Sequence, residues 1–508
     1  MTDDTRVATA VATRPTEGGA AARTLGIPGR LVRGVWFWPA VVMAPLGLWR
    51  IGRPEMWQDE LVTISVAVRS VRQIFALLPK VDAVHGFYYL FMHFWIRLFG
   101  DGAIAVRVPS ALAMVGAAAC VGLIGKRLFG HRAGVLGGLV FAIVPTITRF
   151  GQEARSYAFV VLAASLATLL LLRALERPTF ARWAGYALSL TSIMLLNAVA
   201  TTIVAGHAAA AVAMLWGQPG RRRRWGQFAV AATLGVLPAL PVIYIGSTQA
   251  TRQMSWIPDD HFWTVWPQTF GSTWLAWAVT LVAVPAFLLR RQSAVFGALV
   301  AVVPVVLVWL VSLGDLHYFF SKYLLFTLPA WAVLAGAGLA AARLRTATAA
   351  GLVLLAAAAV PGQLAMRERL SHAWYTYPSA PGMVARDYSG IAHIIADNYQ
   401  PGDGVVYDRL KWWYLHDVAV RYYLPKNVKP RDVFLYITAA QDGELRSIEC
   451  SAAVACMRPY PRVWLVTPDE TDTPLETVSQ DEKRALRPYA TDRIWHTSGM
   501  TVTLLIMR

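Results

Sequence analysis

Apolar runs long enough to cross a membrane recur along this chain, and they constrain its fold more than any other feature. A helix needs roughly 20 residues to cross about 30 Å of hydrocarbon. Only 15% of the 508 residues are charged and 56% are hydrophobic, whereas a soluble domain has about 25% charged residues. The pattern predicts a polytopic α-helical membrane protein with about 11 transmembrane helices, at about 32–50, 103–125, 132–148, 155–173, 182–197, 199–218, 226–246, 264–289, 294–313, 319–341 and 346–361.

Basic residues occupy every second connection between these runs. Because cytoplasmic loops carry an excess of Lys and Arg, the alternation predicts a cytoplasmic N-terminus. It also explains the net charge of +17 as a topology signal rather than as nucleic-acid binding. Arg221 to Arg224 are also compatible with an anionic-lipid or nucleic-acid site, but we favour a topological anchor. The basic groups are Arg23, Arg30 and Arg33; Lys126, Arg127 and Arg132; Arg173, Arg177 and Arg182; Arg221 to Arg224; Arg290 and Arg291; and Arg343 and Arg345.

This topology divides the chain into three segments. Residues 1–31 lack the basic start and apolar centre of a signal peptide, and their composition predicts a disordered cytoplasmic tail. Residues 32–361 form the membrane domain, whose first outer loop is long, at 51–102. Its stretches 61–78 and 87–99 are amphipathic and helix-like, and they need not cross the membrane. An odd number of spans places residues 362–508 on the extracytoplasmic side of the plasma membrane.

The C-terminal segment has the pattern of a small α/β domain. Helices are predicted at 388–399 and 480–486, and strands at 404–407, 433–437, 463–466 and 502–506. The first helix is followed by the turn signal Pro401-Gly402. Cys450 and Cys456 can form a disulfide if this segment faces an oxidising compartment, and Cys120 lies in an apolar run.

Polar residues gather at the predicted outer ends of the spans. An ionisable group near hydrocarbon costs about 2.5–3.5 kcal/mol on insertion scales, so such groups usually mark a site or a water-filled cavity. We therefore expect a cavity that opens outward, with solvated loop charge as the alternative. His207, within an apolar run, is expected to form a hydrogen bond between helices. The outer group comprises Asp59, Glu60, Asp82, His85, His93, Arg149, Gln152, Glu153, Arg155, Tyr157, Asn197, Gln253, Trp256, Asp259, Asp260, His261, His317, Lys322 and Tyr323.

Several of these residues belong to motifs that resemble one glycosyltransferase family. The GT-C glycosyltransferases, in the branch of protein O-mannosyltransferases and lipid A aminoarabinose transferases (glycosyltransferase family 39-like), share the order of motifs found here. Lys322 stands where the family has Arg, and His85-Gly86-Phe87 where it often has His-Pro-Pro. The matching motifs are Trp57-Gln58-Asp59-Glu60, Asp82-Ala83-Val84-His85-Gly86-Phe87-Tyr88-Tyr89, Arg97-Leu98-Phe99-Gly100 with Arg107, Gln152-Glu153-Ala154-Arg155-Ser156-Tyr157, and Lys322-Tyr323-Leu324-Leu325 with Pro329.

The resemblance implies a role for each matching residue. Asp59 would be the general base that takes the proton of the acceptor hydroxyl, and Glu60 would help to orient it. Arg155 and Lys322 would neutralise the departing lipid phosphate, and His85 would lie near the acceptor or the phosphate. The further substrate-binding residues implied are Tyr88, Glu153 and Tyr157.

The implied activity is inverting transfer of a monosaccharide from a polyprenyl-phosphate donor at the outer face of the membrane. Mannose is the expected sugar, and a cell-envelope glycan or lipoglycan the expected acceptor. A protein O-mannosyltransferase and an arabinose-type pentose transferase are the alternatives within this chemistry. A lipid or glycan flippase is the rival of another class. Transporters typically show internal repeats and broken spans, and we expect neither here.

The residues themselves are suited to this chemistry. Glycosyl transfer needs a base in reach of the attacking hydroxyl and cations where charge grows on the leaving phosphate, and Asp59 with Arg155 and Lys322 meet both needs. The sequence has no Gly-rich phosphate loop and no Asp-x-Asp pair, which argues against a nucleotide-sugar donor bridged by a metal. We predict no cofactor and no protein metal site, and leave a divalent metal requirement open.

Overall fold

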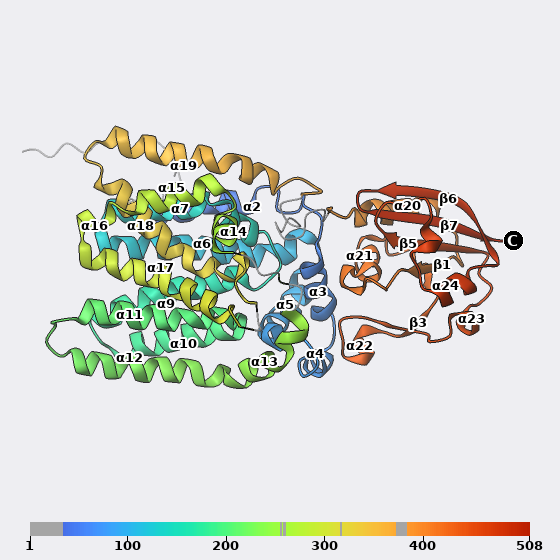
Figure 1. Ribbon diagram of the computed structural model, residues 1–508, viewed down its shortest axis with the longest axis horizontal. Helices are drawn as coiled ribbons and strands as arrows, with labels where there is room; N and C mark the ends of the chain where they lie inside the picture. Colours follow the sequence, from blue (N-terminus) through green and yellow to red (C-terminus); the bar gives the residue numbers. More distant parts are fainter. Residues whose placement is uncertain (1–33, 255–256, 258–260, 315–316, 372–383) are drawn as a thin grey trace, which may run out of the picture. The chain divides into compact units, whose positions relative to one another are not determined.

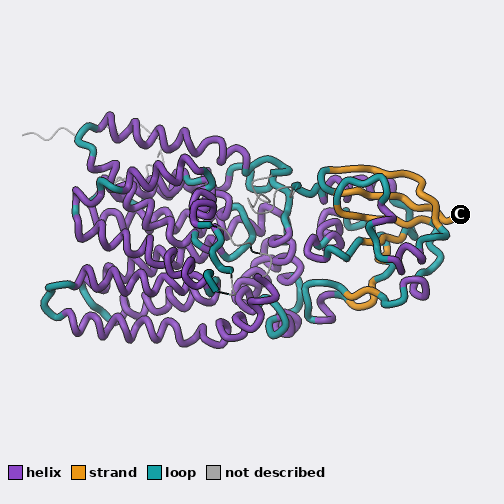
Figure 2. The backbone as a smooth tube through the Cα atoms, viewed as in Figure 1, coloured by secondary structure: helices purple, strands orange, loops and turns teal. Residues whose placement is uncertain are grey.

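The computed structural model describes residues 34–254, 257, 261–314, 317–371 and 384–508. The predicted tail at 1–31 and the candidate residues Trp256, Asp259 and Asp260 lie outside the described residues. Figure 1 shows the helices of the membrane domain packed side by side, and Figure 2 shows that the strands belong to the C-terminal segment. Both predicted classes of structure are therefore present.

Each predicted apolar run coincides with one or more helices (Figure 1). Small residues allow close packing among them: a Cβ on Gly336 of α18 would lie 2.2 Å from the backbone nitrogen of Gly137 in α7. The helices are α2 (Phe37–Leu48), α6 (Ala103–Phe129), α7 (His131–Ile143), α8 (Pro145–Gly151), α9 (Tyr157–Glu176), α10 (Phe180–Leu196), α11 (Ile203–Leu215), α12 (Arg221–Val236), α13 (Leu240–Met254), α14 (Phe262–Phe270), α15 (Thr273–Ala283), α16 (Ala286–Leu289), α17 (Arg291–Val311), α18 (Leu328–Ala341) and α19 (Arg345–Ala365).

Not every helix is long enough to span a bilayer by itself. Among the described residues, five stretches are sufficiently long and apolar, and the number reaches seven if each of two bent helix pairs is one span. Shorter apolar helices occupy Phe37–Leu48, Phe180–Leu196, Val199–Leu215 and Leu325–Ala341. The count of eleven spans stays a prediction.

Two predicted spans are broken, which corrects the expectation of unbroken ones. α7 and α8 meet at 66°, and α14 meets the Thr273–Leu289 stretch at 88°. The first break falls at Pro145, which cannot donate the hydrogen bond that a continuous helix needs. The carbonyl of Ile143 is left without its helical partner where α7 ends, and Gln363 Nε2 donates to it at 2.9 Å. The second break falls at Gly271, whose φ of +76° favours glycine.

The first outer loop contains three helices and no long span. These are α3 (Gln58–Ala67), α4 (Val71–Leu77) and the aromatic α5 (Gly86–Phe99), close to the predicted helical stretches at 61–78 and 87–99. Ser70 caps α4 by accepting from the Gln73 backbone N–H, while the Gln73 side chain accepts from the Ser70 backbone N–H. The cap explains why the predicted 61–78 stretch divides into two helices.

The C-terminal segment is an α/β domain around a five-stranded sheet of order β2-β1-β5-β7-β6. β1 pairs in parallel with β2 and β5, and β7 pairs antiparallel with β5 and β6. The strands are β1 (Gly404–Tyr407), β2 (Arg431–Asp432), β5 (Arg462–Pro468), β6 (Tyr489–Thr497) and β7 (Met500–Met507), with β3 (Leu435–Ile437) and β4 (Ile448–Glu449) in a separate pair; the helices are α20 (Tyr388–Asn398), α21 (His416–Tyr423), α22 (Ala439–Asp442), α23 (Ala453–Cys456) and α24 (Gln480–Ala485).

The predicted elements of this domain agree with the structure, but β2, β4, β6, α21, α22 and α23 were not predicted. β6 was not predicted because it lies at the sheet edge and carries exposed polar residues at its centre, including Thr491, Asp492 and Arg493. Cys450 and Cys456 form a disulfide, and Cys120 is a buried free thiol.

Candidate active site

Asp59 and Glu60 lie in the first turn of α3, which follows the extended residue Trp57. Carboxylates are favourable there because a helix N-terminus carries a partial positive charge. Successive helical residues point about 100° apart around the axis, so the two side chains diverge. The structure therefore separates two carboxylates that are adjacent in the sequence.

Glu60 points into the protein, where it is fully buried against Arg107 of α6. Arg107 Nε and Nη2 donate to the two carboxylate oxygens at 2.7 and 2.6 Å. The backbone N–H of Ala154 donates to Glu60 Oε1 at 2.9 Å. Because both oxygens are bonded within the protein, Glu60 does not reach an acceptor directly, contrary to the role that the resemblance implies. It instead holds the 153–155 segment against α3.

Asp59 points toward two cations from distant parts of the chain. Its Oδ2 lies 3.2 Å from Lys322 Nζ and 3.8 Å from Arg155 Nε. Burial acts to raise the pKa of Asp59, but Lys322 and Arg155 outweigh it and lower the pKa to about 2. The structure thus brings Arg155 and Lys322 to Asp59, as the resemblance implies.

His85 lies beside Arg155 in the same group. Arg155 Nη2 donates to His85 Nε2 at 3.1 Å, because a guanidinium has no acceptor. The other ring nitrogen, Nδ1, is buried without a hydrogen-bond partner among the described residues. Burial, and then Arg155, lower the pKa of His85 well below its usual value. His85 is therefore a neutral imidazole with its proton on Nδ1.

Tyr89 and Gln253 belong to this polar group, although the sequence assigned them no role. Tyr89 Oη donates to Asp82 Oδ2 at 2.6 Å, and Gln253 Nε2 donates to Asp82 Oδ1 at 3.1 Å. Arg155 Nη1 donates to Tyr89 Oη at 3.5 Å. Asp82 has a φ of +57°, a left-handed conformation that Asp tolerates better than most residues. The sequence signal for Tyr89 was its place in the His85 motif.

Glu153 is a second carboxylate at this site, and it is fully buried. Trp57 Nε1 donates to Glu153 Oε1 at 3.2 Å, and Arg149 Nη1 lies 4.0 Å from Oε2. Oε2 accepts no hydrogen bond from the described residues. Burial raises the pKa of Glu153 to about 7 against the effect of Arg149. Near neutral pH Asp59 is therefore ionised, whereas Glu153 exchanges readily between its protonated and ionised forms.

Lys322 is surrounded by aromatic rings, which favour a cation through their negative faces. Its Nζ lies between 5.5 and 5.9 Å from the ring centres of Trp57, Tyr157, Phe320 and Tyr323. Lys322 belongs to a short 3₁₀ turn, Ser321–Tyr323, and the next turn, Leu325–Thr327, packs against α9. This packing brings the late motif to the Arg155 motif at the start of α9.

Two other candidate residues lie in the hydrophobic core. Tyr88 is 1% exposed, and its ring packs against Phe91 and Phe159, with centres 6.3 and 5.8 Å away. It supports the contact of α5 with α9. His207 Nε2 and Nδ1 lie 3.0 Å from Thr168 Oγ1 and 3.2 Å from Tyr186 Oη, so the predicted hydrogen bond between helices is present.

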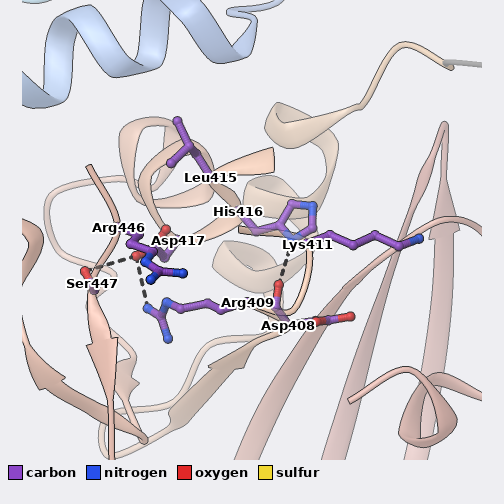
Figure 3. Close-up of a pocket in the computed structure, with 8 residues that line it drawn as sticks. All are labelled: Asp408, Arg409, Lys411, Leu415, His416, Asp417, Arg446 and Ser447. Carbon is purple, nitrogen blue, oxygen red and sulfur yellow. Dashed lines mark hydrogen bonds and ion pairs between the residues drawn. The ribbon is translucent and has the colours of Figure 1, made fainter. Parts of the chain in front are cut away.

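The C-terminal domain has a separate polar pocket at the end of β1 (Figure 3). Arg409 lies within it and forms ion pairs with Asp417, Asp432 and Glu449. Among the described residues, no three His, Cys, Asp or Glu side chains come together as a metal ion would require.

Comparison with known proteins gives a family match for one part of the chain. Residues 86–245 match the family model described as dolichyl-phosphate-mannose-protein mannosyltransferase. This range begins directly after His85 and includes Arg155. No curated protein sequence matches the chain significantly.

The chain is also similar in fold to solved glycosyltransferase structures. ArnT from Cupriavidus metallidurans matches in the apo state (TM-score 0.56, 14% identity) and bound to undecaprenyl phosphate (TM-score 0.59, 13% identity), in both cases over 94% of this chain and 98% of ArnT. The Archaeoglobus fulgidus oligosaccharyltransferase matches with a TM-score of 0.52 and 11% identity, over 92% of this chain and 72% of that protein. The family model thus matches about a third of the chain, and the solved structures extend the likeness in fold to nearly all of it.

Proposed function

We propose that the protein transfers a monosaccharide from a polyprenyl-phosphate donor to a hydroxyl acceptor, with inversion. The observation that carries this proposal is the Asp59 carboxylate, which contacts Lys322 and Arg155 at 3.2 and 3.8 Å. A base and two phosphate-binding cations are the groups that this reaction needs.

Binding of the donor would make Asp59 a better base. A carboxylate with a pKa of about 2 accepts protons poorly at neutral pH. When the donor phosphate takes up the charge of Lys322 and Arg155, it weakens their effect on Asp59, and burial then raises the carboxylate pKa. Asp59 thus gains basicity only when a donor is present.

The chemical step is a single displacement at the anomeric carbon. The acceptor oxygen forms a bond to this carbon, and the bond from the carbon to the phosphate oxygen breaks. The bonding electron pair leaves with the lipid phosphate, next to Arg155 and Lys322. The hydroxyl proton passes to Asp59, so charge moves from the carboxylate to the phosphate within one group of cations.

Glu153 and His85 are suited to binding the sugar or the acceptor. Glu153 Oε2 and His85 Nδ1 are buried polar atoms without hydrogen-bond partners among the described residues, and such atoms are usually satisfied by a ligand or water. With a pKa of about 7, Glu153 can donate or accept. Tyr157 borders the same space beside Lys322.

The matched proteins support the donor class. The description of the family model names a sugar linked to dolichyl phosphate, and one matched ArnT structure contains undecaprenyl phosphate. We propose mannose as the sugar, a cell-envelope glycan or lipoglycan as the acceptor, and the extracytoplasmic face as the side of reaction. A flippase remains the rival, because the two broken spans remove one argument against it.

A donor panel tests the proposal. Purified protein in lipid vesicles would be given polyprenyl phosphates that carry mannose, glucose or arabinose, with and without acceptor glycans. We expect release of polyprenyl phosphate and a glycosylated product with one donor. Movement of intact donor across the bilayer without cleavage would instead support the flippase. The variant Asp59→Asn is the control: donor cleavage that persists in it would come from a contaminating activity.

A further inference from the structure

The loop that leads into α3 is held from two sides. On the membrane-domain side, Arg107 Nη1 donates to the carbonyls of Ile51 and Pro54 at 2.8 and 2.9 Å. The same guanidinium binds Glu60. This side of the loop is therefore fixed by a buried ion pair.

The other side of the loop is held by residues that follow the last membrane helix. The Glu55 backbone N–H donates to the Arg369 carbonyl at 2.8 Å, and the Met56 N–H donates to Tyr423 Oη of α21 at 2.8 Å. The Glu55 carboxylate accepts from the Ser389 backbone N–H at 2.6 Å and from Ser389 Oγ at 3.1 Å. Ser389 lies in the first turn of α20.

The electrostatic surroundings of Glu55 are unusual for such a contact. Arg369 Nη1 lies 3.8 Å from Glu55, but its guanidinium is already bound to Asp387 at 2.5 and 2.9 Å. Burial raises the pKa of Glu55 to about 7, and Asp387 adds to this while Ser389 and Arg369 oppose it. The charged and titratable groups that face Glu55 are Arg107, Arg369, Asp387, Tyr388, Tyr422 and Tyr423.

We propose that Glu55 is a positioning residue through which the C-terminal domain holds the loop that carries Asp59. This inference rests on the proposed function, in which Asp59 is the base. Only Met56, Trp57 and Gln58 separate the two carboxylates along the chain, and Trp57 itself contacts both Glu153 and Lys322. A loosened Glu55 contact would therefore displace the base relative to Arg155 and Lys322.

The strength of the docking contact made by Glu55 also depends on pH. The docked state raises the pKa of Glu55 from its ordinary 4.5 to about 7, so it binds more protons than the undocked state between these values. Docking is therefore tightest below about pH 4.5 and weakens as the pH rises through about 7. Glu55→Gln mimics the protonated side chain and removes this dependence.

Hydrogen exchange over residues 51–60 of the full-length protein measures docking without reference to activity. We expect the protection of these amides in the wild type to fall about tenfold or more between about pH 5.5 and about pH 8.5. Glu55→Gln should stay protected at both values, and Glu55→Ala should lose protection at both. Glu476→Gln, at an exposed glutamate of the same domain paired with Lys483, is the matched control and should behave as the wild type.

Kinetics then test the positioning role. We expect kcat of the wild type to decline as the pH rises toward about 7 and to level off above it, because Glu55 is then ionised in both the docked and the undocked state. Glu55→Gln should lack this decline, and the donor KM should change little in either. Equal pH profiles of kcat in the wild type and Glu55→Gln would overturn the pH dependence, as would protection that does not depend on pH in the wild type. Equal protection in the wild type and Glu55→Ala would overturn the positioning role. If the wild type cleaves no donor, the proposed function fails, while the exchange data still decide whether Glu55 docks the domain.

Discussion

At the scale of single residues, two cations from distant parts of the chain lower the pKa of Asp59 and hold it ionised. Asp59→Asn keeps the shape of the side chain, but the amide cannot take up the proton of the acceptor hydroxyl. Because general base catalysis contributes about 10²–10⁴-fold, we expect kcat to fall by at least about 100-fold. Donor affinity should be kept or increased, since Arg155 and Lys322 lose a competing anion. Titration of donor binding together with turnover checks both parts.

The control for this substitution is Asp492→Asn, at an exposed residue of β6. It should leave both turnover and donor affinity unchanged. Full turnover by Asp59→Asn would show that another group accepts the proton, and Glu153 would then be the first residue to replace.

Lys322 gives a prediction about pH dependence. Its removal in Lys322→Ala takes away the largest attraction on the Asp59 carboxylate, so the Asp59 pKa rises from about 2. The acid limb of kcat/KM in a pH profile should move to higher pH, and the donor KM should increase. Lys322→Arg keeps the charge and should show a smaller shift, while Lys426→Ala, at an exposed lysine, should show none. An unchanged acid limb in Lys322→Ala would show that the ionisation controlling the rate is not that of Asp59.

At the scale of elements, the Glu60–Arg107 pair connects α3 to α6 and to the segment before α9. Glu60→Gln leaves the fully buried Arg107 without a carboxylate, and breaking such a pair costs about 3–5 kcal/mol. We expect a Tm several degrees lower in detergent micelles, with a loss of turnover that follows the loss of folded protein. The exposed Glu368→Gln is the matched control. An unchanged Tm would mean that Arg107 finds another partner.

The broken helix α7–α8 gives a second prediction at this scale. Gln363 of α19 donates to the Ile143 carbonyl and to Thr148 Oγ1, at 2.9 and 3.0 Å. Gln363→Leu leaves that carbonyl unsatisfied at the break, which costs about 1–3 kcal/mol. The Tm of Gln363→Leu should therefore be lower than that of the wild type. Leu364→Ala, at the exposed neighbouring residue, is the control and should leave the Tm nearly unchanged.

At the scale of the whole molecule, the disulfide makes the proposed orientation testable. If residues 362–508 are extracytoplasmic, a maleimide that cannot cross the membrane should label Cys450 and Cys456 in intact cells only after mild reduction. Cys120, buried in α6, should stay unlabelled under both conditions. Labelling that requires permeabilised cells would reverse the orientation.

The candidate site was partly predictable from the sequence, because its motifs could be matched one by one. Asp59, Arg155 and Lys322 were named in this way, and the structure brings them together. Glu60 received a role at the acceptor from the same motif, but the helical twist of α3 directs its side chain to Arg107. Tyr88 and Tyr89 show the same effect, since one joins the core and the other the polar group. Which neighbour faces the site is decided by packing.

The positions of the apolar runs and the alternation of basic loops are local properties, so they could be read from the sequence, and they predict a helical membrane protein with a C-terminal α/β domain. The break at Pro145 has a local cause too, but the hydrogen bond that satisfies the Ile143 carbonyl at the break comes from Gln363, 220 residues along the chain. Only the tertiary structure decided that Glu55 contacts Ser389 and that Lys322 reaches Asp59, which lie 334 and 263 residues apart. Such contacts depend on how whole helices pack, and no local pattern encodes them.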